Sequence, residues 1–138
     1  MKTHQGTTLI QNGQLIDGTG NAPVLNGSVL VHDGKIKYSG PSADCPQTPE
    51  DAVKIDALGG TIMPGLVEAH FHATYFNVAE LTDLDIKYPV EYVSLLASAN
   101  CKMALECGYT SARAGGCLFN CDYCCVKPLK TILYTVQD

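Results

Sequence analysis

The stretch LVEAHFH at residues 66–72 decides the expected fold, because a short apolar run typical of a buried strand leads into two closely spaced histidines. Alternate side chains of a strand point to the same face, so His70 and His72 are expected on one side. Imidazole is a good ligand for zinc and other first-row metals. The spacing predicts a metal site at these histidines, with two ordinary polar residues at a strand end as the alternative. Glu68 falls on the same face by the same rule, either near the site or as a solvated carboxylate.

The residues after this strand predict a crossover helix and a second strand. Pro89 opens a run in which apolar residues recur at helical spacing, and Gly108 ends the run as a C-terminal cap would. Residues 110–113 then favour a strand, so residues 66–113 are expected to form a strand–helix–strand unit. The helix should bury the following stripe against the sheet: Tyr92, Leu95, Leu96, Ala99 and Met103.

The residues before the strand predict a small all-β unit. Asn12-Gly13 and Asp33-Gly34 each lie between β-prone runs. These dipeptides favour two-residue hairpin turns, because both central residues of such a turn need a positive φ. We therefore expect residues 7–63 to form a β-sandwich with a hairpin at each dipeptide.

Composition and charge narrow the classes of function. The 138 residues are 46% apolar and 17% charged, which is typical of a globular domain. The net charge of −5 argues against a nucleic-acid partner. No stretch approaches the roughly 20 apolar residues of a membrane helix, and the first residues lack the apolar core of a signal peptide. We expect a soluble, cytoplasmic protein with no nucleic-acid or membrane partner.

Several segments together resemble the amidohydrolase superfamily of metal-dependent hydrolases, in particular its imidazolonepropionase-like and prolidase-like branch. Residues 12–20 and 27–36 resemble the opening of its N-terminal β-sandwich. Residues 57–72 resemble the return to the sandwich and the first barrel strand with its metal-binding His-x-His. Residues 108–113 resemble the start of the second barrel strand, and the order and spacing match over residues 7–116.

The resemblance implies a mixed fold in three parts. These are a β-sandwich segment over residues 1–63, the start of a (β/α)₈ TIM-type barrel over residues 64–116, and a divergent tail over residues 117–138. It further implies a hydrolase that uses a metal-activated water on the carbon–nitrogen bond of a small-molecule amide, cyclic amide or dipeptide. The divalent metal is usually zinc in this superfamily, and His70 and His72 are the ligands that match. The remaining ligands and a catalytic aspartate come from later strands in the family.

The length of the barrel segment limits what this chain is expected to do alone. A (β/α)₈ barrel needs roughly 250 residues, whereas residues 64–138 number 75. We expect a truncated form of a full-length hydrolase, with two barrel strands at most and most of the active site missing. Such a chain should be inactive alone, and its exposed barrel surface should favour self-association. A catalytically inactive structural or interaction fragment is the alternative.

A cysteine cluster offers a rival site. The chain has seven cysteines, an odd number that predicts reduced thiols rather than a disulfide framework. Four of them lie in the cluster Cys117–Cys125, and three match the CxxxCxxC spacing that holds the iron–sulfur cluster of radical SAM enzymes. That family needs a barrel after the motif, and 14 residues follow Cys124. A zinc site at Cys121 and Cys124 would lack a second ligand pair. Unpaired thiols in a divergent tail are the favoured interpretation.

Overall fold

The chain divides into two compact units, Met1–Pro64 and Gly65–Asp138. The structure, a computed structural model, describes residues 6–75, 78–80, 82–85, 87–117, 119 and 121. Each unit has its own sheet and its own cluster of buried apolar side chains. Within the described residues, neither helix combines the length and the apolar character needed to cross a membrane.

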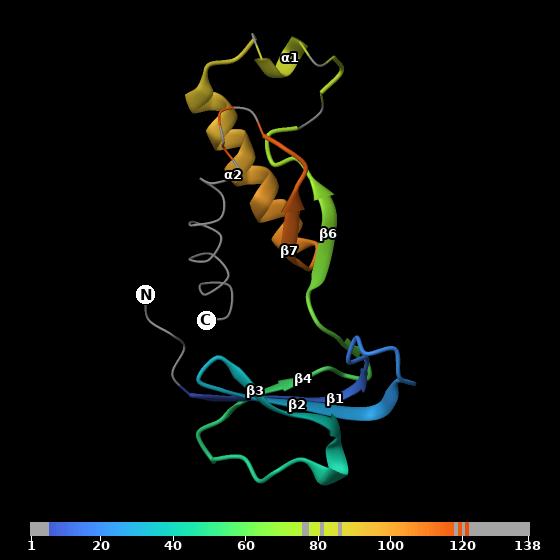
Figure 1. The fold of residues 1–138 in the computed structure, drawn as a ribbon. Helices are drawn as coiled ribbons and strands as arrows, with labels where there is room; N and C mark the ends of the chain where they lie inside the picture. Colours follow the sequence, from blue (N-terminus) through green and yellow to red (C-terminus); the bar gives the residue numbers. More distant parts are fainter. Residues whose placement is uncertain are drawn as a thin grey trace. The chain divides into compact units, whose positions relative to one another are not determined.

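The N-terminal unit is built on one mixed sheet of five strands (Figure 1). The strands are β1 (Thr7–Leu15), β2 (Val24–His32), β3 (Lys35–Pro41), β4 (Val53–Asp56) and β5 (Thr61–Ile62). β1 pairs antiparallel with β2 and parallel with β4 and β5, while β3 pairs antiparallel with β2. A short 3₁₀ helix, η1 (Ser42–Asp44), follows β3. β1 is therefore the strand around which this unit is organised.

The two predicted hairpin dipeptides have different roles in this sheet. Asp33 and Gly34, with φ of 49° and 70°, join β2 to β3, so the hairpin predicted there is confirmed. Asn12 also has a positive φ, 61°, but β1 runs straight through it with a shift of register against β2. The hairpin predicted at Asn12 and Gly13 is therefore wrong. The left-handed residue forms a β-bulge instead, and its carbonyl accepts the Gly59 N–H at 2.8 Å.

The buried cluster of the N-terminal unit is small and aliphatic, and it consists of Leu15, Val29 and Ile62. β4 is exposed at every residue, and Val53 and Ile55 keep about half of their surface in solvent. The described residues before Gly65 form no second sheet, so the predicted β-sandwich is not confirmed. Alternation of apolar residues marks a sheet with one buried face, but it does not specify what covers that face.

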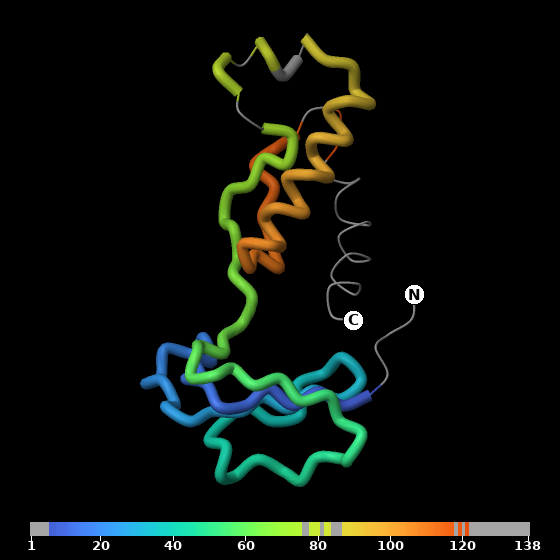
Figure 2. Tube along the Cα trace, turned by 180° about the vertical axis from the view of Figure 1, so that it is seen from behind, coloured from blue at the N-terminus to red at the C-terminus, as the bar shows by residue number. Residues whose placement is uncertain are grey.

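The second unit is a parallel strand pair covered by a helix. Its elements are β6 (Leu66–Phe71), α1 (Thr82–Asp85), α2 (Val90–Glu106) and β7 (Tyr109–Ala114). β6 and β7 pair in parallel, and α2 lies along one face of the pair in both views (Figures 1 and 2). Pro89 is the N-cap of α2, and Gly108 follows its last turn with φ of 89°. The predicted strand–helix–strand order is therefore confirmed.

The face of α2 that packs on the strands is not the predicted one. The buried residues of the helix are Val93, Ala97, Asn100 and Cys101. Most of the predicted stripe is exposed instead, with Tyr92 at 45%, Leu95 at 71% and Met103 at 49%, and with Ala99 exposed and Leu96 half-buried. Two apolar stripes compete on this helix, and the small side chains of the Val93 stripe allow the closer approach to the strands. The predicted self-association through exposed surface stays a prediction.

Candidate metal site

The pairing of β6 with β7 is irregular next to the candidate site. Glu68 is opposite Ala112 and Phe71 is opposite Ala114, so three steps along β6 match two steps along β7. The extra residue is a β-bulge, which re-aims the side chains next to it. His70 lies within this irregular stretch at the C-terminal end of β6, and His72 directly follows the strand.

The structure brings the two predicted ligands together. The Nε2 atoms of His70 and His72 lie 2.8 Å apart, and the two rings meet edge to face with centroids 4.7 Å apart. His70 is exposed and His72 is half-buried. Two ring nitrogens at this distance share one hydrogen, so one ring donates and the other accepts.

Two neighbours hold the ring of His72. Its Nδ1 lies 2.6 Å from the carbonyl oxygen of Gly116. Because a carbonyl oxygen can only accept, Nδ1 is the donor in this contact, and in the neutral ring Nε2 then keeps its lone pair. Tyr75 stacks on the same ring, with centroids 4.2 Å apart and planes within 7° of parallel. His72 is thereby fixed in the tautomer and orientation that a metal ligand needs.

The glycines after β7 were not expected as part of the site. The N–H of Gly115 donates to the carbonyl of Phe71 at 2.8 Å, which ties the end of β7 to the end of β6. A β-carbon on Gly115 would lie 2.7 Å and 2.8 Å from the Nε2 atoms of His70 and His72. A Gly-Gly pair directly after a strand is the signal that could have indicated a close approach. Tyr75 carries no comparable sequence signal.

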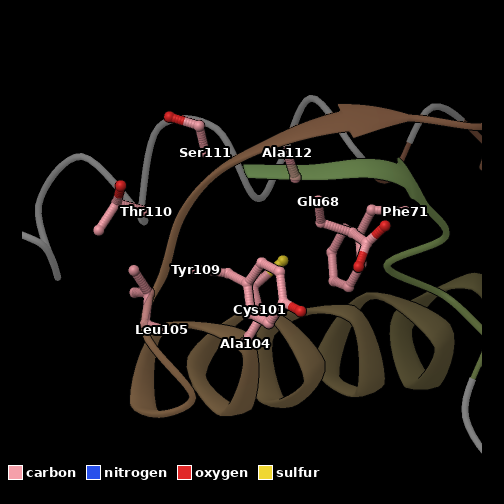
Figure 3. A pocket seen from close by; sticks show the side chains of 9 residues that line it. All are labelled: Glu68, Phe71, Cys101, Ala104, Leu105, Tyr109, Thr110, Ser111 and Ala112. Carbon is pink, nitrogen blue, oxygen red and sulfur yellow. The ribbon is translucent and has the colours of Figure 1, made fainter. Parts of the chain in front are cut away.

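Glu68 does not join the imidazoles. Its side chain lies with Phe71 between the strand pair and α2, where both line a cavity of about 60 Å³ (Figure 3). In a regular strand these two residues would face opposite ways, and the bulge explains why they do not. The carboxylate of Glu68 accepts the backbone N–H of His70 at 3.2 Å. Glu68 therefore supports the strand end through the backbone, and the predicted common face with His70 does not bring its carboxylate to the ring pair.

The residues present fit a divalent cation as part of a ligand set. Two imidazoles that bind one zinc at about 2.0–2.1 Å have nitrogens roughly 3.3 Å apart in a tetrahedral site. The observed separation of 2.8 Å is reached from there by a small rotation of either ring. Gly115 leaves open the space beside both nitrogens. Among the described residues, however, no group of three or more His, Cys, Asp or Glu side chains gathers around a common point.

The cysteine cluster lies only partly within the described residues. Cys121 is buried in the apolar cluster of the second unit, and Cys117 packs against that cluster. The Sγ of Cys121 lies 3.5 Å from the hydroxyl of Ser94. Cys124 and Cys125 lie outside the described residues, as does nearly all of the predicted tail. The CxxxCxxC alternative therefore stays a prediction.

Comparison with known proteins finds sequence relatives for about half of the chain. No family model matches it. The 5-methylthioadenosine/S-adenosylhomocysteine deaminase of Symbiobacterium thermophilum is 44% identical over 66 residues, which are 47% of this chain and 15% of that protein. The imidazolonepropionase of Idiomarina loihiensis is 33% identical over 66 residues, which are 48% of this chain and 16% of that protein. The matches thus span about a sixth of the relatives' own length.

Solved structures resemble a larger share of the chain. The crystal structure of an amidohydrolase has 31% sequence identity and a TM-score of 0.65, over 80% of this chain and 25% of that protein. Molinate hydrolase has a TM-score of 0.73 over 94% of this chain and 28% of that protein, and its 23% identity indicates similarity of fold. Sequence and structure together support similarity to the amidohydrolase superfamily, in an N-terminal portion of its proteins.

Proposed function

We propose that this chain is an N-terminal portion of an amidohydrolase-type hydrolase and that His70 and His72 are two ligands of its divalent metal. The observation that carries the proposal is the contact between their Nε2 atoms, at 2.8 Å, at the C-terminal end of a parallel strand. Strand ends of this kind carry the chemistry of α/β barrels. In this proposal the N-terminal unit corresponds to the N-terminal β-segment of such a hydrolase, and the second unit corresponds to the first two strands of its barrel.

The residues around the pair have distinct roles in this proposal. A divalent cation, zinc by preference, supplies Lewis-acid chemistry when bound and brings the pKa of water down to about 7. His72 offers Nε2 because the carbonyl of Gly116 takes the proton on Nδ1. His70 completes the pair once its own proton moves to Nδ1. Tyr75 covers one face of the His72 ring and limits its rotation.

The proposed reaction class is hydrolysis of a carbon–nitrogen bond in a small molecule. The deaminase and the imidazolonepropionase that resemble this chain support that class. An amide, a cyclic amide or a dipeptide is the proposed substrate of the whole protein. Two imidazoles leave a catalytic zinc site one protein ligand short of the usual three. Among the described residues, no third His, Cys, Asp or Glu side chain gathers with the pair to act as a general base. We therefore propose that this chain alone does not hydrolyse amides.

Zinc binding by the purified chain tests the metal assignment. Equilibrium dialysis should find weakly bound zinc in the wild type that is lost in the double variant His70→Ala, His72→Ala. The matched control is His32→Ala, which removes an exposed imidazole at the end of β2 in the other unit. Equal zinc content in the wild type and the double variant would contradict the assignment.

A hydrolysis assay tests the second part of the proposal. With added zinc and simple amide or dipeptide substrates, the wild type and the double variant should both show background rates. Zinc-dependent turnover that the double variant abolishes would show that the chain is catalytic by itself.

A further inference from the structure

Gly115 lies against both histidines and Gly116 contacts His72, although the two glycines follow a different strand. We infer that these two glycines are the positioning element of the His70–His72 pair, Gly115 by leaving room for both Nε2 atoms and Gly116 by fixing the tautomer of His72. The inference rests on the proposed function only where it predicts an effect on zinc binding.

Gly115 is required by the histidines rather than by its own backbone. Its φ lies outside the left-handed region, so an alanine could adopt the same backbone conformation. The β-carbon of that alanine would lie 2.7 Å from Nε2 of His70 and 2.8 Å from Nε2 of His72. Separations below 3.0 Å are not tolerated by real β-carbons, so one or both rings would have to move. The strand end cannot give way easily, because the N–H of Gly115 is bonded to the carbonyl of Phe71.

Gly116 acts through its backbone instead. Its φ of 111° lies where side chains other than hydrogen are strained. This conformation accompanies the contact of its carbonyl oxygen with Nδ1 of His72 at 2.6 Å. The two glycines therefore divide the task. One sets the space around the metal-facing nitrogens, and the other sets which nitrogen carries the proton.

Another crowded glycine of the same unit provides a matched control. A β-carbon on Gly65 would clash with the side chain of Thr110, and neither residue contacts the histidines in the described contacts. Gly65→Ala should therefore disturb packing only where β6 and β7 begin, whereas the histidines lie at the opposite, C-terminal end of β6. Gly115→Ala should disturb the site with the same chemical change.

The test compares wild type, Gly115→Ala and Gly65→Ala by zinc titration calorimetry and by ¹⁵N spectra of the histidine rings. We expect Gly115→Ala to weaken zinc binding by about tenfold or more and to remove the Nδ1–H signature of His72. Gly65→Ala should keep both properties at wild-type level. Wild-type zinc affinity together with an unchanged His72 spectrum in Gly115→Ala would overturn the inference.

Thermal unfolding midpoints test this inference without any metal, so they separate it from the proposed function. They also apply to variants that are less stable than the wild type. Gly115→Ala should lower the unfolding midpoint of the wild type but not that of the His70→Ala, His72→Ala double variant, which has no rings to displace. An equal loss in both backgrounds would contradict the inference, whether or not zinc binds. If the wild type binds no zinc at the pair, the proposed function fails, and the ¹⁵N spectra and midpoints still decide the role of Gly115.

Discussion

The two units use their polar side chains for different purposes. In the N-terminal unit these side chains fasten turns and strand ends of the sheet. The amide of Asn12 donates to Asp56 at 3.0 Å, and the carboxylate of Asp33 accepts the Gly6 N–H at 3.1 Å. In the second unit the polar side chains at the end of β6 contact each other instead, as the Nε2 atoms of His70 and His72 do. The first arrangement stabilises a fold, whereas the second prepares a site.

The buried clusters of the two units differ in the size of their side chains. The N-terminal cluster contains the large aliphatic side chains of Leu15, Val29 and Ile62. The cluster of the second unit is made of smaller residues, among them Ala73 and two cysteines, and a buried polar residue, Asn100, lies beside it. Small side chains bury less apolar area per residue. The second unit should therefore depend more on individual hydrogen bonds than the first.

The largest expected effect is the loss of a leucine from the N-terminal cluster. Leu15→Ala should lower the free energy of unfolding by about 2–5 kcal/mol, because it removes buried methyl groups and leaves a cavity. The matched variant Leu95→Ala changes a side chain that is 71% exposed, and it should stay within about 0.5 kcal/mol of the wild type. Urea denaturation followed by circular dichroism measures both. Equal losses would mean that Leu95 is covered in solution.

A smaller effect is expected from the buried amide of the second unit. The Nδ2 of Asn100 donates to the carbonyl of Ala73 at 2.7 Å. Asn100→Ala leaves that carbonyl without its donor. It should lower the free energy of unfolding, followed by the helical circular dichroism signal, by about 1–3 kcal/mol. The exposed Asn26, changed to alanine in the same way, serves as the control. If the two variants lose the same amount, the second unit does not rely on this hydrogen bond.

The smallest expected effect depends on pH and belongs to the N-terminal unit. Hydrogen bonds from the hydroxyl and the N–H of Thr19 lower the pKa of Asp17 below its ordinary value of 3.8. A lowered pKa in the folded state stabilises the fold above the unfolded value, and this contribution is lost as the pH falls through the folded value. Asp17→Asn should therefore lower the unfolding midpoint slightly at neutral pH and match the wild type in strong acid. A difference that does not change with pH would exclude this carboxylate as its source.

Local patterns predicted the strand and helix order better than they predicted what each element contacts. Pro89 and Gly108 bound α2 as expected, since capping depends on neighbouring residues in the chain. The buried face of α2 was predicted wrongly, because the choice between its two apolar stripes depends on distant strands. The Asn12 bulge was missed because a turn and a bulge need the same positive φ.

The candidate site shows the same limit. The pairing of His70 with His72 followed from their spacing along the chain, although the bulge between Glu68 and Phe71 includes His70 and changes the alternation there. The contributions of Gly115 and Gly116 depend on the register between β6 and β7, and no local pattern specifies that register. Contacts across strands are therefore the part that needed the structure.

The most direct test of the central claim is a zinc titration of the chain followed by ¹⁵N spectra of its histidine rings. If His70 and His72 share one cation, their Nε2 signals should shift together with a single saturation point, while those of His32 stay in place. Unchanged His70 and His72 signals, or equal shifts at His32, would contradict the claim that this strand end holds a metal.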